Sequence, residues 1–180
     1  MEVTAGQLPG VMRLRPRVFR DARGAVFESH STRALASVGI ADAFVLDVQS
    51  TSVQGVLRGL HYQHPRAQGK LVRVLSGEIF DVVVDLRRGS PAFGRWEASR
   101  LTADTRESLW IPPGFAHGFL IVSATAEVLY KTTSDYAPEH EHCLLWNDPT
   151  LGIAWPLTGA PLLSERDTRG LPLAQAVTFP

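Results

Sequence analysis

An imidazole, a guanidinium and an ammonium lie close together in this sequence, at His61, Arg58 and Lys70. His61 and Arg58 belong to the run Val56–Gln63, and Lys70 opens a second short apolar run. An unpaired charge is costly to bury, and a strand with no role beyond packing would carry aliphatic residues instead. We therefore interpret these groups as part of a site. An imidazole exchanges protons near neutral pH, and the two cations can hold anionic oxygens.

The elements that must position these groups are mostly β-strands. Short β-branched and aromatic runs predict strands at 11–19, 25–29, 44–49, 56–61, 70–75, 78–86, 95–101, 108–111, 118–122, 127–132 and 142–146. A short helix is predicted over Thr32 to Val38, with Ser31 or Thr32 as its N-cap. Strands at this spacing predict an all-β sandwich, jelly roll or barrel. We expect one domain over residues 1–180.

The C-terminal part is different in composition. From Trp155 onward the chain is rich in Pro, Leu and Gly, and residues 162–167 are predicted to form a short helical turn. We expect this part to pack over one end of the β-core.

Side-chain alternation along the strands separates core positions from site positions. In the strand 78–86, Asp81 shares a face with aliphatic residues, as expected where a barrel interior opens into a cavity. The same alternation puts Arg58 and His61 on opposite faces of their strand. Gly59 lies between them, and a β-bulge at this glycine would turn one of the two side chains around.

Composition narrows the function. The chain has 180 residues, 44% of them hydrophobic, and its 18 basic residues balance its 18 acidic residues. A net charge of zero argues against nucleic acid or an anionic membrane as a partner. No apolar run approaches a membrane span and no secretion signal is apparent, so we expect a cytoplasmic protein. Cys143 is the only cysteine, which excludes an internal disulfide, and we expect it to be a buried apolar filler.

A second motif has the spacing Pro-x-Gly-x-x-His, at Pro112, Gly114 and His117. It resembles a motif of the cupins, in which this histidine often binds a metal. Metal-binding cupins also carry His-x-His and a carboxylate, but this chain has His61 and His64, whose spacing places them on opposite faces of a strand. The set of metal ligands found in such cupins is therefore incomplete in this sequence. Because His61, His117 and a carboxylate can still meet in space, a metal-dependent cupin remains an alternative.

Seven runs together resemble the dTDP-4-dehydrorhamnose 3,5-epimerases. They are Val56–Gln63, Gln68–Arg73, Phe80–Asp85, Gly89–Gly94, Trp110–Phe119, Leu129–Thr132 and Leu145–Asp148, in family order. The resemblance implies a cupin-type jelly roll, or double-stranded β-helix, that needs no metal or other cofactor and is usually a homodimer. The implied reaction inverts C3 and C5 of dTDP-4-dehydro-6-deoxy-D-glucose, in the pathway to activated L-rhamnose.

The resemblance also assigns roles. His61 corresponds to the base that removes a proton beside the 4-keto group, and Asp167 corresponds to the aspartate that orients it. Tyr130 corresponds to the acid on the opposite face of the sugar. Lys70 corresponds to the residue that places positive charge near the enolate oxygen. These roles suit the chemistry, because an enolate needs a base, an acid and a cation around it.

Substrate binding is implied for a further set of residues: Phe19, Arg23, Glu28, Arg58, His117 and Tyr136. Phe19, Arg23 and Glu28 would reach the nucleotide in the partner subunit, and Arg58 would hold phosphate. Tyr136 would lie near the sugar. We expect His117, which follows the Pro-Gly turn, to line the pocket, with a hydrogen bond to a backbone carbonyl as the alternative. A guanidinium suits phosphate because its planar fork binds two oxygens at once.

Three positions depart from the family, and one of them is Asp135, in a loop where the family often carries a tyrosine. Leu46 and Val48 stand where the family typically has Gln-x-Asn, so two amides are aliphatic here. The nucleotide or sugar preference can therefore differ. A C3-only or C5-only epimerase acting on a related nucleotide sugar, and a non-catalytic sugar-nucleotide binding module, remain alternatives.

Overall fold

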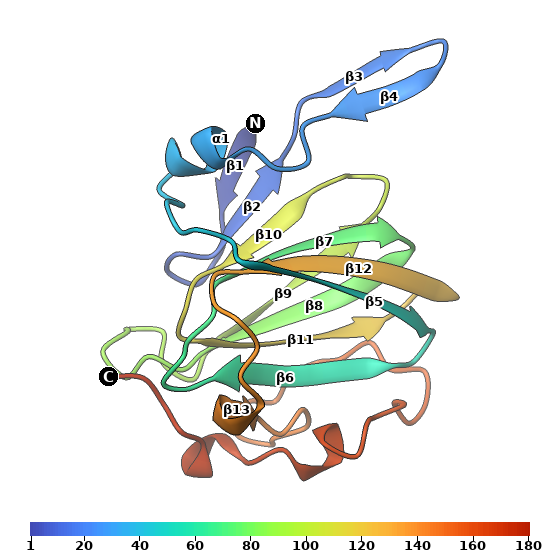
Figure 1. Cartoon of the computed structure of the whole chain (residues 1–180). Helices are drawn as coiled ribbons and strands as arrows, with labels where there is room; N and C mark the ends of the chain where they lie inside the picture. Colours follow the sequence, from blue (N-terminus) through green and yellow to red (C-terminus); the bar gives the residue numbers. More distant parts are fainter.

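The structure, a computed structural model, describes all residues from 1 to 180 and is dominated by antiparallel strands (Figure 1). The strands are β1 Glu2–Ala5, β2 Met12–Arg15, β3 Val18–Asp21, β4 Gly24–Phe27, β5 Leu46–Val53, β6 Leu57–Gln63, β7 Lys70–Ser76, β8 Glu78–Asp85, β9 Trp96–Thr102, β10 Ser108–Ile111, β11 Phe115–Ile121, β12 Thr125–Thr132 and β13 Glu141–Cys143. The helical segments are α1 Thr32–Ala36 and the 3-10 turns η1 Pro138–His140, η2 Asp167–Arg169 and η3 Leu173–Gln175. No helix is long and apolar enough to cross a membrane.

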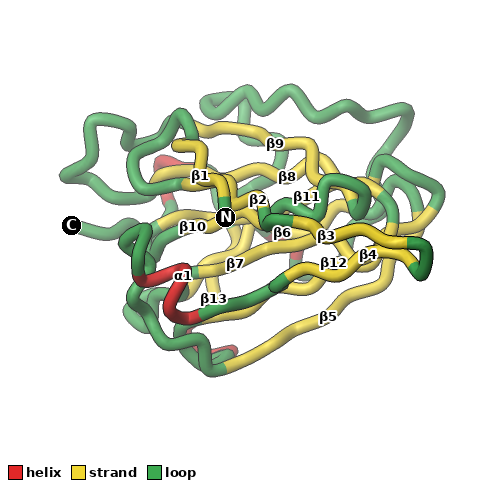
Figure 2. The backbone as a smooth tube through the Cα atoms, turned by 90° about the horizontal axis from the view of Figure 1, so that it is seen from above, coloured by secondary structure: helices red, strands yellow, loops and turns green.

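Two sheets face each other. One has the order β1-β2-β10-β7-β12-β5, and the other has the order β13-β6-β11-β8-β9. Seen from above, β5 and β9 lie at opposite edges of the molecule (Figure 2). The hairpin β3–β4 forms a separate two-stranded ribbon that projects from the body (Figure 1). This arrangement is a cupin-type jelly roll, as the sequence predicted.

The main core lies between the two sheets. Val72 and Val128 from the six-stranded sheet pack with Ile79, Val83 and Phe119 from the five-stranded sheet. The alternation predicted for β8 is therefore confirmed, because its odd-numbered side chains face the interior.

The C-terminal segment covers the outer face of the five-stranded sheet. Trp155, Leu173 and Phe179 pack against the even-numbered side chains of β8, which include Val82 and Val84. The segment therefore covers a sheet face, and the expectation that it packs over one end of the β-core was too narrow. The helical turn predicted at 162–167 starts later than expected. Residue 162 bridges to the chain just before β6, the turn begins at residue 165, and η2 covers Asp167–Arg169.

Other differences have local causes. The strand predicted at 11–19 is split into β2 and β3 at Pro16, which has no N–H to donate to a sheet. Strand β1 was missed; it has only four residues, and all of them are exposed. The helix α1 is confirmed, and its N-cap Ser31 accepts a hydrogen bond from the Ala34 N–H at 3.3 Å.

The turn between β7 and β8 depends on a glycine. Gly77 has φ +77°, and a Cβ there would lie 2.1 Å from the carbonyl oxygen of Thr125. A side chain at this position would have to displace backbone. The tight turn carries the chain from β7 in the six-stranded sheet, which begins at Lys70, to β8 in the five-stranded sheet, which contains Asp81.

We predict that Gly77→Ala lowers the free energy of unfolding by at least about 2 kcal/mol, from the left-handed backbone and the overlap with backbone. Urea unfolding measures the change. Gly159→Ala is the control, because a Cβ at Gly159 meets nothing within 4 Å and should change stability by less than about 1 kcal/mol. Equal unfolding midpoints for the two variants would contradict the prediction.

Candidate active site

A cavity of about 400 Å³ opens between the two sheets. Its walls come from β5, β12 and the start of β7 on one side and from β6 and β11 on the other. The segment from Tyr136 to Glu141 and the neighbouring Arg166 complete the rim. Most side chains that line the cavity are polar or aromatic, which is unusual for the interior of a jelly roll and marks the cavity as a candidate site.

A β-bulge brings Arg58 and His61 to the same cavity. In the pairing of β6 with β11, His61 faces His117 and Arg58 faces Phe119, so β6 carries one extra residue. Gly59 has φ +109°, and a Cβ there would lie 2.6 Å from the backbone oxygen of His117. The bulge predicted at Gly59 is confirmed, and its physical basis is a close approach of two backbones that only glycine permits.

His61 is hydrogen-bonded to a buried aspartate. Its Nε2 lies 2.6 Å from Oδ1 of Asp167, and the Asp167 side chain is only 3% exposed. Oδ1 also accepts from the Gly59 N–H at 3.3 Å, and Oδ2 accepts from the Ser164 hydroxyl at 2.7 Å. Burial alone would raise the pKa of Asp167, but the hydrogen bonds from His61 and Ser164 outweigh it and hold the pKa below its ordinary value. Asp167 is therefore an anion that fixes the orientation of the imidazole.

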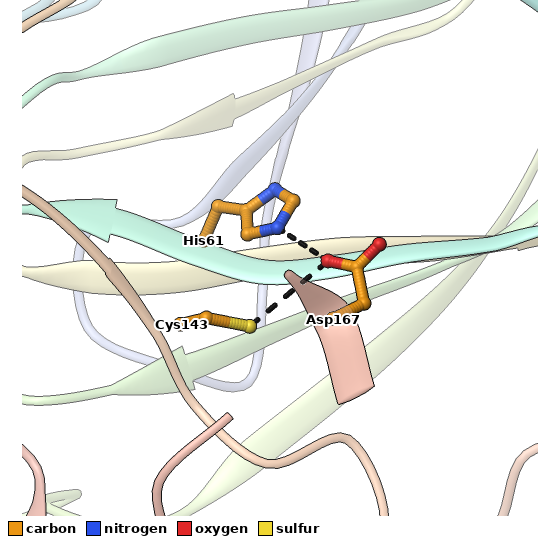
Figure 3. Close-up of side chains that lie close together, drawn as sticks. All are labelled: His61, Cys143 and Asp167. Carbon is orange, nitrogen blue, oxygen red and sulfur yellow. Dashed lines mark hydrogen bonds and ion pairs between the residues drawn. The ribbon is translucent and has the colours of Figure 1, made fainter. Parts of the chain in front are cut away.

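A cysteine lies beside this pair (Figure 3). Cys143 is the cross-strand partner of His61, and its Sγ lies 4.0 Å from Oδ1 of Asp167. Burial, and then the charge of Asp167, raises the pKa of Cys143 to about 12, so the thiol keeps its proton. The expectation of a buried apolar filler needs correction, because the half-buried thiol contacts a charged oxygen. Nothing near Cys143 in the sequence indicated this contact.

The donor atoms of His61, Cys143 and Asp167 all lie within 4.8 Å of one another. This separation alone would suit a metal ion. However, the imidazole Nε2 is already bonded to the carboxylate, and the thiol is in its protonated form, whereas metal ligands are deprotonated. The donor set therefore suits hydrogen bonding better than it suits a metal.

The second histidine has its own carboxylate. His117 Nε2 lies 2.8 Å from Oδ2 of Asp81, and both side chains are buried. Burial lowers the pKa of His117 despite the nearby carboxylate. The metal alternative required His61 and His117 to share a carboxylate. Instead, each imidazole is paired with a different aspartate.

Lys70 and Tyr130 line the same cavity as His61. The Lys70 ammonium donates to the His61 carbonyl oxygen at 3.2 Å, and burial lowers its pKa to about 8. Burial also raises the pKa of Tyr130, so this phenol keeps its proton near neutral pH. The structure thus brings together the four residues predicted to be catalytic: His61, Lys70 and Tyr130 line the cavity, and Asp167 lies behind His61.

The rim of the cavity contains polar groups that sequence reasoning missed. The Tyr136 hydroxyl donates to Glu141 at 2.7 Å, and Arg166 contacts both of these side chains. Arg58 donates to the hydroxyl of Ser52 at 3.0 Å. Tyr136 and Arg58 were predicted as binding residues. Glu141 and Arg166 have no local motif and become neighbours only through the fold.

The hairpin residues lie elsewhere. Phe19, Arg23 and Glu28 do not line the His61 cavity. Phe19 is 52% exposed, and Arg23 forms an exposed ion pair with Asp21. Within one chain the structure therefore does not bring the hairpin to the cavity, and the prediction that these residues reach the nucleotide of a partner subunit stays a prediction.

A cupin-type jelly roll with a histidine–aspartate pair, a tyrosine and a buried lysine at one cavity defines a class of acid–base catalyst. The family model described as dTDP-4-dehydrorhamnose 3,5-epimerase matches residues 5–175. The chain therefore belongs to this family of isomerases. A relative of the same description from Pseudomonas aeruginosa is 56% identical over 181 residues, and the alignment covers 100% of this chain and 100% of the relative.

Solved structures agree with this assignment. A dTDP-6-deoxy-D-glucose-3,5-epimerase from Legionella pneumophila, in complex with dTDP-4-keto-L-rhamnose, is 43% identical with a TM-score of 0.94 over 97% of this chain and 93% of that chain. A 3'-monoepimerase from Streptomyces bikiniensis in complex with dTDP-quinovose is 34% identical with a TM-score of 0.87, over 93% of this chain and 86% of that chain.

The low pKa of Lys70 predicts a pH-dependent stability. Between pH 8 and 10.5 the folded protein loses the Lys70 proton while the unfolded chain keeps it, so the cost of burying this charge disappears as the pH rises. The unsubstituted protein therefore becomes more stable as the pH rises, and Lys70→Met does not share this gain. The free energy of unfolding of Lys70→Met minus that of the unsubstituted protein should fall by about 2 kcal/mol from pH 7 to pH 10. Urea unfolding at both pH values measures the difference. A constant difference would show that Lys70 is not a perturbed lysine.

Proposed function

We propose that this chain inverts C3 and C5 of dTDP-4-dehydro-6-deoxy-D-glucose to give dTDP-4-dehydro-L-rhamnose, with His61 as the base and Tyr130 as the acid. The observation that carries the proposal is that the imidazole of His61 and the hydroxyl of Tyr130 line one cavity together with the Lys70 ammonium. Such a cavity can hold a sugar ring between a proton acceptor and a proton donor.

The tautomer of His61 follows from its hydrogen bond. Nε2 is held by Oδ1 of Asp167, so Nε2 carries the proton and Nδ1 carries the lone pair. Nδ1 removes a proton from the carbon beside the C4 ketone. The resulting imidazolium is stabilised by the Asp167 carboxylate, which stays ionised.

Lys70 stabilises the charge that develops in this step. When the proton leaves C3 or C5, electrons move onto the oxygen at C4 and form an enolate. The Lys70 ammonium is buried, and a donor aimed at such an oxygen in a dry site contributes about 3 kcal/mol to the barrier reduction. With a pKa of about 8, Lys70 is mostly charged at neutral pH and deprotonates in mild alkali.

Tyr130 completes the inversion. A proton returned from the face opposite to the base reverses the configuration of the carbon. Burial keeps the phenol protonated, so it is ready to donate. C3 and C5 both flank the C4 ketone, so the same acid and base act at each carbon in turn.

Solvent exchange tests this proposal. In heavy water the protein should place deuterium at both C3 and C5 of the substrate, as read by NMR, because each inverted carbon receives a solvent-derived proton. His61→Ala should lose on the order of a hundredfold or more in exchange at both carbons. Tyr130→Phe should lose inversion while exchange by the base persists.

His142→Asn is the matched histidine control, because His142 stacks on Tyr62 and does not line the cavity. It should retain exchange. Deuterium at C3 alone would show that the protein inverts only C3 and would contradict the proposed double inversion. Full exchange in His61→Ala would remove this residue from the mechanism.

We infer that the working unit is a homodimer in which the hairpin of one subunit reaches the nucleotide of the other. Two observations support this. The hairpin β3–β4 projects from its own subunit (Figure 1), and its apolar residues Phe19 and Val26 are 52% and 69% exposed. An isolated two-stranded ribbon is marginally stable, so a neighbouring surface is needed to hold it. Arg58, inside the cavity, holds the diphosphate from the other side.

In light scattering, the molar mass should be twice 19.7 kDa. Arg23→Ala should raise KM about tenfold with little change in kcat, because a charge-assisted hydrogen bond to phosphate is lost. Arg20→Ala removes another arginine of the same hairpin and serves as the control. A monomer, or equal KM values for the two variants, would contradict the role of the hairpin.

A further inference from the structure

The wall of the cavity formed by β5 changes character along the strand. Asp47 and Gln49 point outward, where they bond to Lys131 and Glu127 on the outer face of the sheet. Alternation therefore turns Leu46, Val48, Ser50 and Ser52 inward. Leu46 and Val48 are the only aliphatic side chains that line the cavity. Ser52, at the far end of this series, holds Arg58.

The sheet register relates this change to the reacting groups. Thr132 of β12 lies between Lys70 and Leu46, so these three residues form one row across the sheet. In the next row Tyr130 is the direct cross-strand partner of Val48. The apolar part of the wall therefore lies at the Lys70 end of the cavity, and the polar part lies toward Arg58.

The row at Lys70 offers no free donor apart from Lys70 itself. The Thr132 hydroxyl donates to the carbonyl oxygen of Ser134 at 2.9 Å. The side chain of Leu46 has no polar atom. A substrate hydroxyl that faces the side chains of Leu46 and Val48 would therefore lose hydrogen bonds to water and find no polar partner on these two residues.

The shape of the sugar fits this division. In a pyranose ring C1 and C4 are opposite each other, and C6 is attached to C5, the neighbour of C4. If the oxygen at C4 lies at Lys70, then the diphosphate on C1 points toward Arg58. The C6 group then lies at the Lys70 end, where Leu46 and Val48 form the wall.

We infer that Leu46 and Val48 form a binding surface for the C6 methyl group and select 6-deoxy sugars over sugars that carry a hydroxyl at C6. This inference rests on the proposed function for the placement of the C4 oxygen. A purely apolar surface rejects an added hydroxyl only moderately, by about ten- to a hundredfold.

Two unreactive ligands test the surface without catalysis. dTDP-6-deoxy-D-glucose and dTDP-D-glucose differ only in the hydroxyl at C6. Calorimetry should give a dissociation constant for the 6-deoxy compound that is lower by about ten- to a hundredfold. Equal affinities for the two ligands would overturn the inference, whatever the result of the deuterium exchange experiment. A preference for the 6-deoxy ligand without any exchange would support the surface and overturn the proposed reaction.

Variants of nearly the same side-chain volume test whether Leu46 and Val48 cause the preference for the 6-deoxy ligand. Val48→Thr and Leu46→Asn add polar atoms at nearly constant volume, and each should reduce the ratio of the two dissociation constants severalfold. Val53→Thr makes the same change on the same strand at a residue that is 53% exposed and outside the cavity, so the ratio should stay constant. A ratio that is equally large in all three folded variants would assign the selection to other residues and overturn the role of Leu46 and Val48.

Discussion

A buried carboxylate must find hydrogen-bond donors, and in this protein three donors to Asp167 come from two parts of the chain. His61 supplies its imidazole and Gly59 a backbone N–H from β6, while Ser164 supplies a hydroxyl from the C-terminal segment. Removing any of them would leave a buried charge partly unpaired, which is strongly unfavourable. The same set of bonds therefore anchors the C-terminal segment to the sheet and fixes the orientation of the His61 imidazole.

Lys70, unlike Arg166 at the rim, is held in the cavity without an ion-pair partner. Lys70 has no carboxylate within bonding distance, and its low pKa reflects the cost of removing an ammonium from water. Asp81 is engaged by His117 instead. The cavity thus keeps a positive charge whose donors are directed to a backbone oxygen and to the open space, which is what an enolate oxygen requires.

Local sequence was informative wherever a short-range rule determines the structure. The bulge at Gly59, the interior position of Asp81 and the strands that carry both could be predicted from glycine chemistry and from side-chain alternation. The contact of Cys143 with Asp167 and the rim pair of Glu141 and Arg166 could not be predicted. These contacts join segments that only the complete fold brings together, and the alternation of residues along a strand does not predict them.

The aspartate that orients the His61 imidazole lies 106 positions away from it along the chain. It belongs to the C-terminal segment, which contributes no strand to the two main sheets. This segment is joined to the rest of the protein through side-chain packing and a few isolated β-bridges. Proteolytic release of this segment would remove the carboxylate that fixes the imidazole, although His61, Lys70 and Tyr130 themselves lie on strands of the two sheets.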